Sequence, residues 1–230
     1  MKLLAFETAT EACSVAVLVD GEVRERFEIA PRRHAELALP WADALLAEAG
    51  ITRAQLDAIA VGRGPGAFTG VRLAIAIAQG IALALDRPVV PVSTLAALAM
   101  QAGGDRRIAA IDARMGEVYL ASFMREDDAL RALGDEVVVA PASAPLPDGD
   151  GWHGAGTGFA AVEGALQARF AGRLAAVDAT ALPHAADVAR LAVLAYARGE
   201  ALAPERIEPA YLRNNVALTI AERAAQGITR

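Results

Sequence analysis

Apolar and polar residues alternate in short blocks over residues 1–30. Apolar runs occupy residues 3–6 and 13–19, and the polar stretch 7–11 lies between them. The second run ends at an Asp-Gly pair, which is a strong signal for a tight hairpin turn, so a third strand is expected over 24–29. The pattern therefore predicts a strand–turn–strand unit that continues into a hairpin.

A helix and a second strand–helix–strand series are expected next. The segment from about 36 to 49 has a helical pattern because Leu37, Trp41 and Leu45 recur at a spacing of four. Pro40 is then expected in the first turn, where its missing N–H costs little. Further on, the pattern predicts a buried strand, a glycine-rich loop, an apolar helix and another strand, over 56–61, 62–70, 71–85 and 89–92.

The second half of the chain repeats this order of elements, although its sequence similarity to the first half is slight. An acidic residue ends the first strand of each half, Glu7 after 3–6 and Asp112 after 108–111. Further strands are expected over 118–123 and 136–139, and helices over about 160–170 and 185–198.

The repeat predicts an α/β fold of two duplicated lobes. The first lobe is expected to span residues 1–102 and the second residues 103–215. Residues 216–230 are expected to form a C-terminal helix or tail that returns across the lobes.

Composition and charge exclude several classes of protein. The 230 residues are 55% apolar and 22% charged, which is the composition of a folded domain rather than of a disordered tail. The net charge of −6 disfavours free-standing binding of nucleic acid, which needs a basic face. Lys2 is the only lysine, so a P-loop or Schiff-base lysine is excluded.

The sequence predicts a cytoplasmic protein that does not enter the membrane. Its single cysteine, Cys13, cannot form an intramolecular disulfide, which suits a reducing compartment. The N-terminal residues lack the apolar core of a secretory signal. The most apolar stretch, 73–85, is interrupted by Gln79 and Gly80 and is too short to span hydrocarbon.

The strongest local signal is the loop GRGPGAFTGVR at residues 62–72. Its glycines permit tight turns, and free N–H groups at the start of the following helix favour an anion. A phosphate or carboxylate cradle and a purely structural turn remain equally open, because the spacing matches neither of the regular nucleotide-binding motifs. The cradle would use Gly64, Gly66, Thr69, Gly70 and Arg72.

The polar turn after the first strand is a second candidate for phosphate binding. Actin-like nucleotide-binding folds place hydroxyl groups and a carboxylate at such a turn, where they contact phosphates and a metal-bound water. Thr8, Thr10 and Glu7 are the residues here that fit these roles. The alternative is that the threonines only hydrogen-bond the backbone of the turn, which is the more common role of such hydroxyls.

A metal site and a catalytic nucleophile are not expected in this chain. His34, His153 and His184 are far apart, and none has a second histidine at helical spacing. Cys13 begins an apolar strand and is expected to be a buried, inert thiol.

The apolar helix over 71–85 has two rows of small residues at a spacing of four. One row is Ala74, Ala78 and Ala82, and the other is Ala76, Gly80 and Ala84. One side of the helix can rest on its own sheet, and the other can face a partner together with the preceding helix. The alternative is that both sides belong to the core. The expected partner residues are Leu37, Trp41, Leu45, Val71, Ala74, Ile75, Ala78 and Ala82.

Several segments in the right order resemble one known family. They include LLAFETATEACSVAV at 3–17, the loop and helix at 62–82, IDARMGEVYLA at 111–121 and PAYLR at 209–213. Together they are similar to the TsaB family of partner subunits in bacterial tRNA threonylcarbamoyladenosine biosynthesis. Little is recognisable between residues 127 and 181.

The resemblance implies an actin-like fold (ASKHA, ribonuclease H-like) and a chain that is not itself the catalyst. The implied role is that of a scaffold and activator of a paralogous transferase, TsaD, which is bound through the helices over 34–49 and 71–85. A TsaE-like ATPase is implied in the same complex, tRNA is reached only through the complex, and the chain alone is expected to be a homodimer. No cofactor is implied in this chain. ATP and a metal ion are expected in the partner subunits or at the subunit boundary.

Three other functions are open at this point. The first is an actin-fold small-molecule kinase or ATPase acting alone, for which Glu7 and Asp112 are the only symmetric pair of carboxylates. The second is a metalloprotease, which the missing histidine pair disfavours. The third is a structural domain without a partner, which is favoured only if Trp41 is fully buried.

Overall fold

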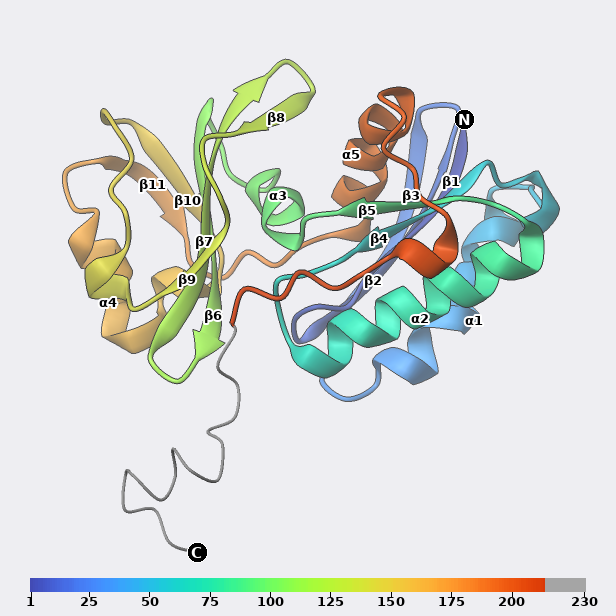
Figure 1. Cartoon of the computed structure of the whole chain (residues 1–230), viewed down its shortest axis with the longest axis horizontal. Helices are drawn as coiled ribbons and strands as arrows, with labels where there is room; N and C mark the ends of the chain where they lie inside the picture. Colours follow the sequence, from blue (N-terminus) through green and yellow to red (C-terminus); the bar gives the residue numbers. More distant parts are fainter. Residues whose placement is uncertain (214–230) are drawn as a thin grey trace, which may run out of the picture.

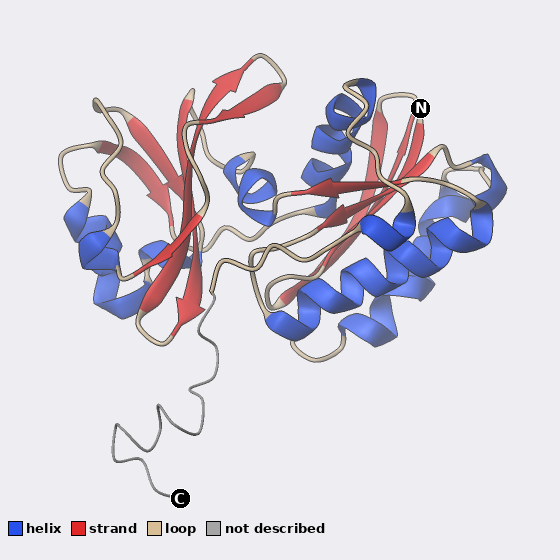
Figure 2. Ribbon diagram, in the orientation of Figure 1, coloured by secondary structure: helices blue, strands red, loops and turns tan. Residues whose placement is uncertain are grey.

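Five strands form the first sheet, in the order β3-β2-β1-β4-β5. The computed structural model describes residues 1–213 and shows this sheet on the right of Figures 1 and 2. The central strand β1 pairs antiparallel with β2 and parallel with β4. The strands are β1 (Lys2–Glu7), β2 (Ala12–Val19), β3 (Glu22–Ile29), β4 (Ala58–Gly62) and β5 (Val89–Val92).

Helices cover both faces of this sheet because its central strands are apolar on both sides. In β1, Leu4 and Phe6 point to one core, and Leu3 and Ala5 point to the other. The helices α1 (His34–Glu48) and α2 (Phe68–Leu85) pack on the first face, and α5 (Ala185–Ala197) packs on the second (Figure 2). The sheet with these three helices is called the first lobe below.

The predicted hairpin and the predicted first helix both occur, but the helix starts earlier than expected. Asp20 and Gly21 have φ angles of 50° and 98°, which is the geometry of the tight turn that an Asp-Gly pair favours. Because α1 begins at His34, Pro40 lies inside the helix and not in its first turn, and that prediction is wrong. Pro40 and Glu36 are both exposed, so water can bond the Glu36 carbonyl that Pro40 leaves free.

The second sheet repeats the arrangement of the first. Its order is β11-β10-β6-β7-β8, and β9 pairs with β7 as β3 pairs with β2. The two strands of the β6–β7 hairpin correspond to β1 and β2, and β10 lies parallel to β6 as β4 lies parallel to β1. The strands are β6 (Arg106–Arg114), β7 (Glu117–Glu126), β8 (Ala129–Ala132), β9 (Val137–Val139), β10 (Trp152–Ala155) and β11 (Leu174–Asp178).

Two helices cover the second sheet. The chain from residue 106 to residue 178, which contains this sheet, is called the second lobe below. The short helix α3 (Thr94–Ala99) packs on one face through Leu95 and Leu98, and α4 (Ala161–Arg169) packs on the other through Leu166. α3 also contributes Ala97 to the core beneath α5, so it lies between the lobes.

The second lobe begins near the expected residue 103, with β6, but it ends well before the expected residue 215. α5 lies after the second sheet in sequence but packs on the first sheet, where its small residues Ala185, Ala189 and Ala192 meet Leu3 and Ala5. The chain beyond α5 stays with the first lobe as far as Ala210 and then reaches the second lobe at Arg213. The expected tail at 216–230 lies outside the described residues.

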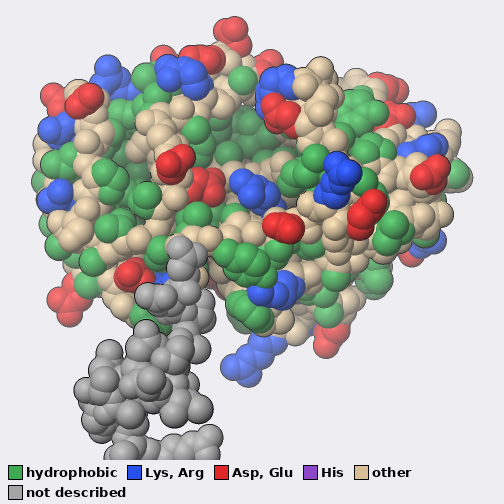
Figure 3. Space-filling view, in the orientation of Figure 1, with side chains coloured by type: hydrophobic (Ala, Val, Ile, Leu, Met, Phe, Trp, Pro, Cys, Tyr) green, Lys and Arg blue, Asp and Glu red, His purple; other side chains and the backbone are tan. Residues whose placement is uncertain are grey.

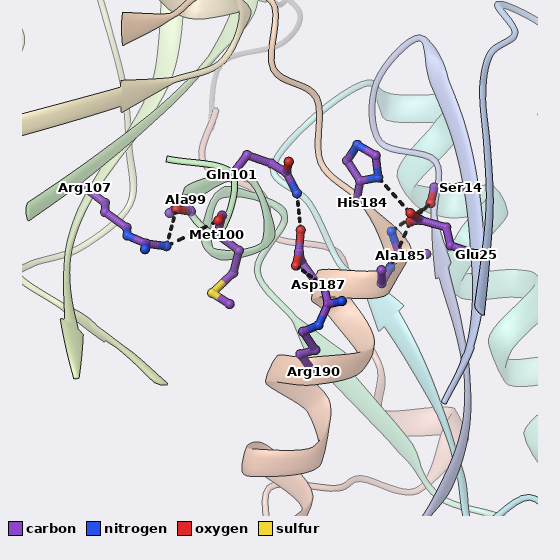
Figure 4. A network of polar contacts seen from close by, with 11 residues as sticks. Ser14, Glu25, Ala99, Met100, Gln101, Arg107, His184, Ala185, Asp187 and Arg190 are labelled. Carbon is purple, nitrogen blue, oxygen red and sulfur yellow. Dashed lines mark hydrogen bonds and ion pairs between the residues drawn. The ribbon is translucent and has the colours of Figure 1, made fainter. Parts of the chain in front are cut away.

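A polar network joins the two lobes where α5 begins (Figure 4). His184 Nδ1 lies 2.9 Å from Glu25 Oε2 on β3, and Ser14 donates to the other carboxylate oxygen of Glu25 at 2.7 Å. One turn along α5, Asp187 accepts hydrogen bonds from Arg190 and from Gln101, which follows α3. The start of α5 is therefore tied both to the first sheet and to the chain crossing between the lobes.

A third member of the network holds the end of α3. Arg107 of β6 is buried and donates to the backbone carbonyls of Ala99 and Met100 at 3.0 and 3.3 Å. The Ala99 carbonyl also accepts the Ala102 N–H at 3.2 Å, and the guanidinium adds a side-chain donor that fixes the end of α3 to the second sheet.

The His184–Glu25 pair predicts a specific pH dependence of stability. The hydrogen bond to Glu25 raises the pKa of His184 above 6.5, and Asp187 adds to the rise while burial and Arg190 oppose it. A raised pKa of a cation stabilises the fold below pH 6.5, and this contribution is lost as pH rises through the raised pKa. We expect His184→Gln to cost about 1–2 kcal/mol at pH 5.5 and clearly less at pH 8.5.

The measurement is urea unfolding of both proteins across this pH range. Glu25→Gln should reproduce the pattern because it removes the same charge pair. A cost of His184→Gln that does not change with pH would show that the charge of His184 contributes nothing.

Candidate functional site

A cleft of about 700 Å³ lies between the lobes. The β1–β2 turn, the residues before α1 and the start of α2 form its first-lobe side. The turn of the β6–β7 hairpin, residues 157–161 and the segment 209–213 form the rest of its lining. Of the residues predicted to bind an anion, Thr10, Gly66 and Arg72 line this cleft.

The glycine-rich loop packs directly on the β1–β2 turn. A Cβ at Gly66 would lie 2.4 Å from the carbonyl oxygen of Ala9, and one at Gly70 would lie 1.9 Å from that of Thr8. The Ala67 N–H donates to the Ala9 oxygen at 2.7 Å. These glycines are therefore required by the close approach of two backbone segments, which accounts for them without a ligand. The anion cradle stays a prediction.

Glu7 is buried behind this loop and not in the cleft. Its Oε1 accepts the Ala9 N–H at 2.7 Å, and its Oε2 accepts the Thr94 hydroxyl at 2.8 Å. Gly62 admits the carboxylate, because a Cβ there would lie 1.9 Å from Oε2. Burial raises the pKa of Glu7 to about 7, although these hydrogen bonds partly oppose the rise. Both carboxylate oxygens thus have partners inside the protein.

The two threonines of the turn bond to the backbone, which is the alternative that the sequence left open. Thr8 Oγ1 donates to the Gly70 carbonyl at 2.7 Å, and Thr10 Oγ1 accepts the Ala12 N–H at 3.3 Å. Gly64 donates to Thr94 Oγ1 at 3.1 Å, and Thr69 is exposed in the first turn of α2.

Arg72 lies at the mouth of the cleft between two aromatic rings. Its guanidinium carbon is 3.2 Å from the centroid of Phe68 and 5.0 Å from that of Tyr211. It also donates to the Tyr211 hydroxyl. Sequence reasoning singled out Arg72 but neither ring, because Tyr211 reaches it from the far end of the chain.

The carboxylates and histidines do not gather at one place. Asp112 lines the cleft and is paired with Arg114 at 2.9 Å, whereas its counterpart Glu7 is buried elsewhere. His34 contacts the Thr10 carbonyl, and His184 contacts Glu25. Within residues 1–213, three His, Cys, Asp or Glu side chains close enough to hold a metal ion are not found.

The partner residues expected from the sequence are mostly in the core, which corrects that prediction. Side chains with almost no exposed surface cannot meet a partner. Leu37 and Trp41 are only partly buried, so the condition that would favour a domain without a partner is not met. The six buried residues are Leu45, Val71, Ala74, Ile75, Ala78 and Ala82.

The second row of small residues on α2 is the exposed one. Ala76, Gly80 and Ala84 face away from the sheet, and a Cβ at Gly80 would meet nothing within 4 Å. α2 begins at Phe68 and has 18 residues, so by length and composition it is the one described helix that could cross a membrane. In this fold α2 packs on the first sheet, although only 28% of its residues are buried.

The raised pKa of Glu7 predicts that the stability of the protein depends on pH, and the variant Glu7→Gln isolates this effect. The pKa of Glu7 is about 7 in the fold against 4.5 in the unfolded chain. The folded state therefore binds the additional proton, and the contribution of Glu7 to the free energy of unfolding falls by roughly 3 kcal/mol as pH rises from 4.5 to 7. Glu7→Gln has no such proton, so its stability relative to the native protein should improve over this range.

Unfolding free energies measured at pH 4.5 and pH 7.5 test this. Glu22→Gln on the exposed end of β3 is the control and should follow the native protein. If the free energies of unfolding of Glu7→Gln and of the native protein differ by the same amount at both pH values, the raised pKa of Glu7 is ruled out.

Comparison with known proteins agrees with the fold. A family model described as TsaD, tRNA N6-adenosine threonylcarbamoyltransferase, matches residues 27–221. A solved structure titled YeaZ from Pseudomonas aeruginosa is 49% identical, with a TM-score of 0.86 over 92% of this chain and 99% of that chain. A second one, titled an uncharacterized protein with similarity to peptidase YeaZ from the same species, is 47% identical with a TM-score of 0.85. The expected actin-like α/β fold of two duplicated lobes is confirmed.

Curated proteins of similar length decide the family. The tRNA threonylcarbamoyladenosine biosynthesis protein TsaB of Escherichia coli is 41% identical over 94% of this chain and 96% of its own length. The protein of the same name from Haemophilus influenzae is 40% identical over 94% and 95%. The chain therefore belongs to the TsaB family of tRNA threonylcarbamoyladenosine biosynthesis proteins.

Proposed function

We propose that this chain is a non-catalytic partner subunit in tRNA threonylcarbamoyladenosine biosynthesis. It binds and activates a paralogous threonylcarbamoyltransferase, TsaD. The contact is made by the outer face of α2 together with the part of α1 around the exposed Leu39. The outer face of α2 is formed by exposed or partly exposed apolar residues on the side away from the sheet, namely Phe68, Leu73, Ala76, Ile77, Gly80, Leu83 and Ala84.

The observation that carries this proposal is the exposure of that face. Phe68 and Leu83 are 65% and 62% exposed, and Leu39 of α1 is 49% exposed. Hydrophobic side chains lie at the surface in the region of α2, among isolated charged ones (Figure 3). A row of exposed apolar side chains along one helix face is typical of a docking surface.

The small residues at the centre of the face favour a helix as the partner element. Ala76, Gly80 and Ala84 form a shallow row along which a second helix can approach closely, while Ile77 and Leu83 flank it. Burial of several hundred Å² of such surface supplies about 25 cal/mol per Å² before the costs of association. A second copy of the chain can use the same face, which supports a homodimer when the paralogue is absent.

The inner surfaces of the first lobe support a role without chemistry. The carboxylate of Glu7 and the hydroxyl of Thr8 are buried and bonded within the chain. We therefore place ATP and the metal ion in the partner subunits or at the subunit boundary, and a TsaE-like ATPase in the same complex. With a net charge of −6, the chain reaches tRNA only through the complex, in the cytoplasm.

Gly80→Arg is the sharpest test, because it separates docking from folding. The new side chain meets open space, and replacing a mid-helix glycine should stabilise the isolated protein by about 0.5–1 kcal/mol. The same side chain holds a partner helix away, so affinity for the paralogue should fall by more than about 100-fold, or about 2.8 kcal/mol. Thermal unfolding and titration calorimetry measure the two effects.

Ala168→Arg is the matched control, since it adds the same charge to an exposed helix of the second lobe. It should bind the paralogue as the native chain does. Undiminished binding by Gly80→Arg would refute docking through this face. Stoichiometric binding and turnover of ATP by the chain alone would instead favour the kinase or ATPase.

A further inference from the structure

A strap, residues 202–213, runs from the end of the α5 region beside α2 and on to the second lobe (Figure 1). Ile207 of the strap is buried in the core beneath α1 and α2. Hydrogen bonds fix its course on the first lobe. Among them, the Leu202 N–H donates to the Val89 carbonyl at 2.8 Å, Gln79 donates to the Pro204 carbonyl at 2.8 Å, and the Ala210 N–H donates to the Arg63 carbonyl at 2.9 Å.

The other end of the strap is bound to the second lobe through one side chain. Arg213 donates to Glu117 Oε2 at 2.5 Å and to the Ala113 carbonyl at 3.2 Å, at the two ends of the β6–β7 turn. Arg213 is 18% exposed, so this ion pair is partly shielded from water. Among the described residues, every hydrogen bond from the strap to the second lobe comes from Arg213.

Tyr211 links this tether to the outer face of α2. It lies two residues before Arg213, and its ring stacks on Arg72, which in turn stacks on Phe68. Tyr211 is 57% exposed and Phe68 is 65% exposed. The three side chains form one continuous surface, to which the strap contributes Tyr211 and α2 contributes the other two.

We propose that the strap couples docking on α2 to the separation of the two lobes, an inference that rests on the proposed function. With Arg213 on Glu117, the lobes are held together and Tyr211 is held against Arg72. A partner that covers Phe68 and Arg72 then also contacts the Tyr211 ring. When Arg213 is released, Tyr211 keeps only its first-lobe contacts, which are the Arg72 side chain and the Ala210 hydrogen bond beside it, so its ring is held less firmly and its contact with the partner weakens.

The partner therefore binds the tethered state more tightly, which is the differential contact that coupling requires. Docking therefore favours the tethered state and narrows the range of distances between the lobes. By thermodynamic linkage, the tether raises the affinity for the partner by the same factor by which the partner stabilises the tethered state.

The first experiment needs no partner. Spin labels on Arg24→Cys and Gln167→Cys report the distance between the lobes, since both sites are exposed and the native Cys13 is buried. Arg213→Ala and Glu117→Ala should each broaden the distance distribution and lengthen its mean. Arg114→Ala, in the same hairpin turn but bonded to Asp112, should not. Unchanged distributions in folded Arg213→Ala and Glu117→Ala would overturn the tether.

The second experiment adds the TsaD paralogue. We expect the paralogue to narrow the distribution of distances between the spin labels in the native protein. It should bind Tyr211→Ala at least about fivefold more weakly and leave the distance distribution of that variant unchanged. Equal affinity and equal narrowing for Tyr211→Ala would overturn the coupling. If the paralogue does not bind the native chain, the proposed function and the coupling both fail, whereas the first experiment still decides the tether.

Discussion

A helix has two sides, and a single sheet can cover only one of them. α2 is apolar nearly all round, and the first lobe buries only one side of it, formed by Val71, Ala74, Ile75, Ala78 and Ala82. The strap covers part of the remainder through Gln79, and the rest meets water. This leaves an apolar face with a shallow central row, whose exposure costs free energy that a second helix can recover. The proposed docking and its coupling to the lobes both depend on that unpaired face.

On the inner side of the first lobe, the β1–β2 turn and the glycine-rich loop both look suited to binding a ligand. They pack against each other instead. Gly66 and Gly70 allow the loop to touch the β1–β2 turn, and Glu7 is enclosed between the turn, the loop and Thr94. A carboxylate with both oxygens satisfied and a pKa raised to about 7 is poorly suited to hold a cation. The chemistry of the fold is thus proposed to reside in a partner.

The sequence predicts the first lobe well and the second less well, for physical reasons. Apolar runs buried on both faces and an Asp-Gly turn locate β1 to β3 closely. The two small-residue rows of α2 were also predictable, but not which row meets the sheet, because Ala74 and Ala76 look alike in sequence. β8 and β11 are short and largely exposed, and β10 is buried but only four residues long, so their patterns are weak. The position of α5 and the meeting of Arg72 with Tyr211 are set by contacts between distant segments, which no local pattern encodes.

The most direct test of docking through α2 is the reactivity of single cysteines along its two sides. Ala76→Cys and Ala84→Cys lie on the outer face, Ala168→Cys lies on the second lobe, and the native Cys13 is buried. When a saturating amount of the paralogue is added, thiol labelling at 76 and 84 should slow strongly while labelling at 168 stays constant. A complex that forms with labelling at 76 and 84 unchanged would place the partner elsewhere and contradict the account.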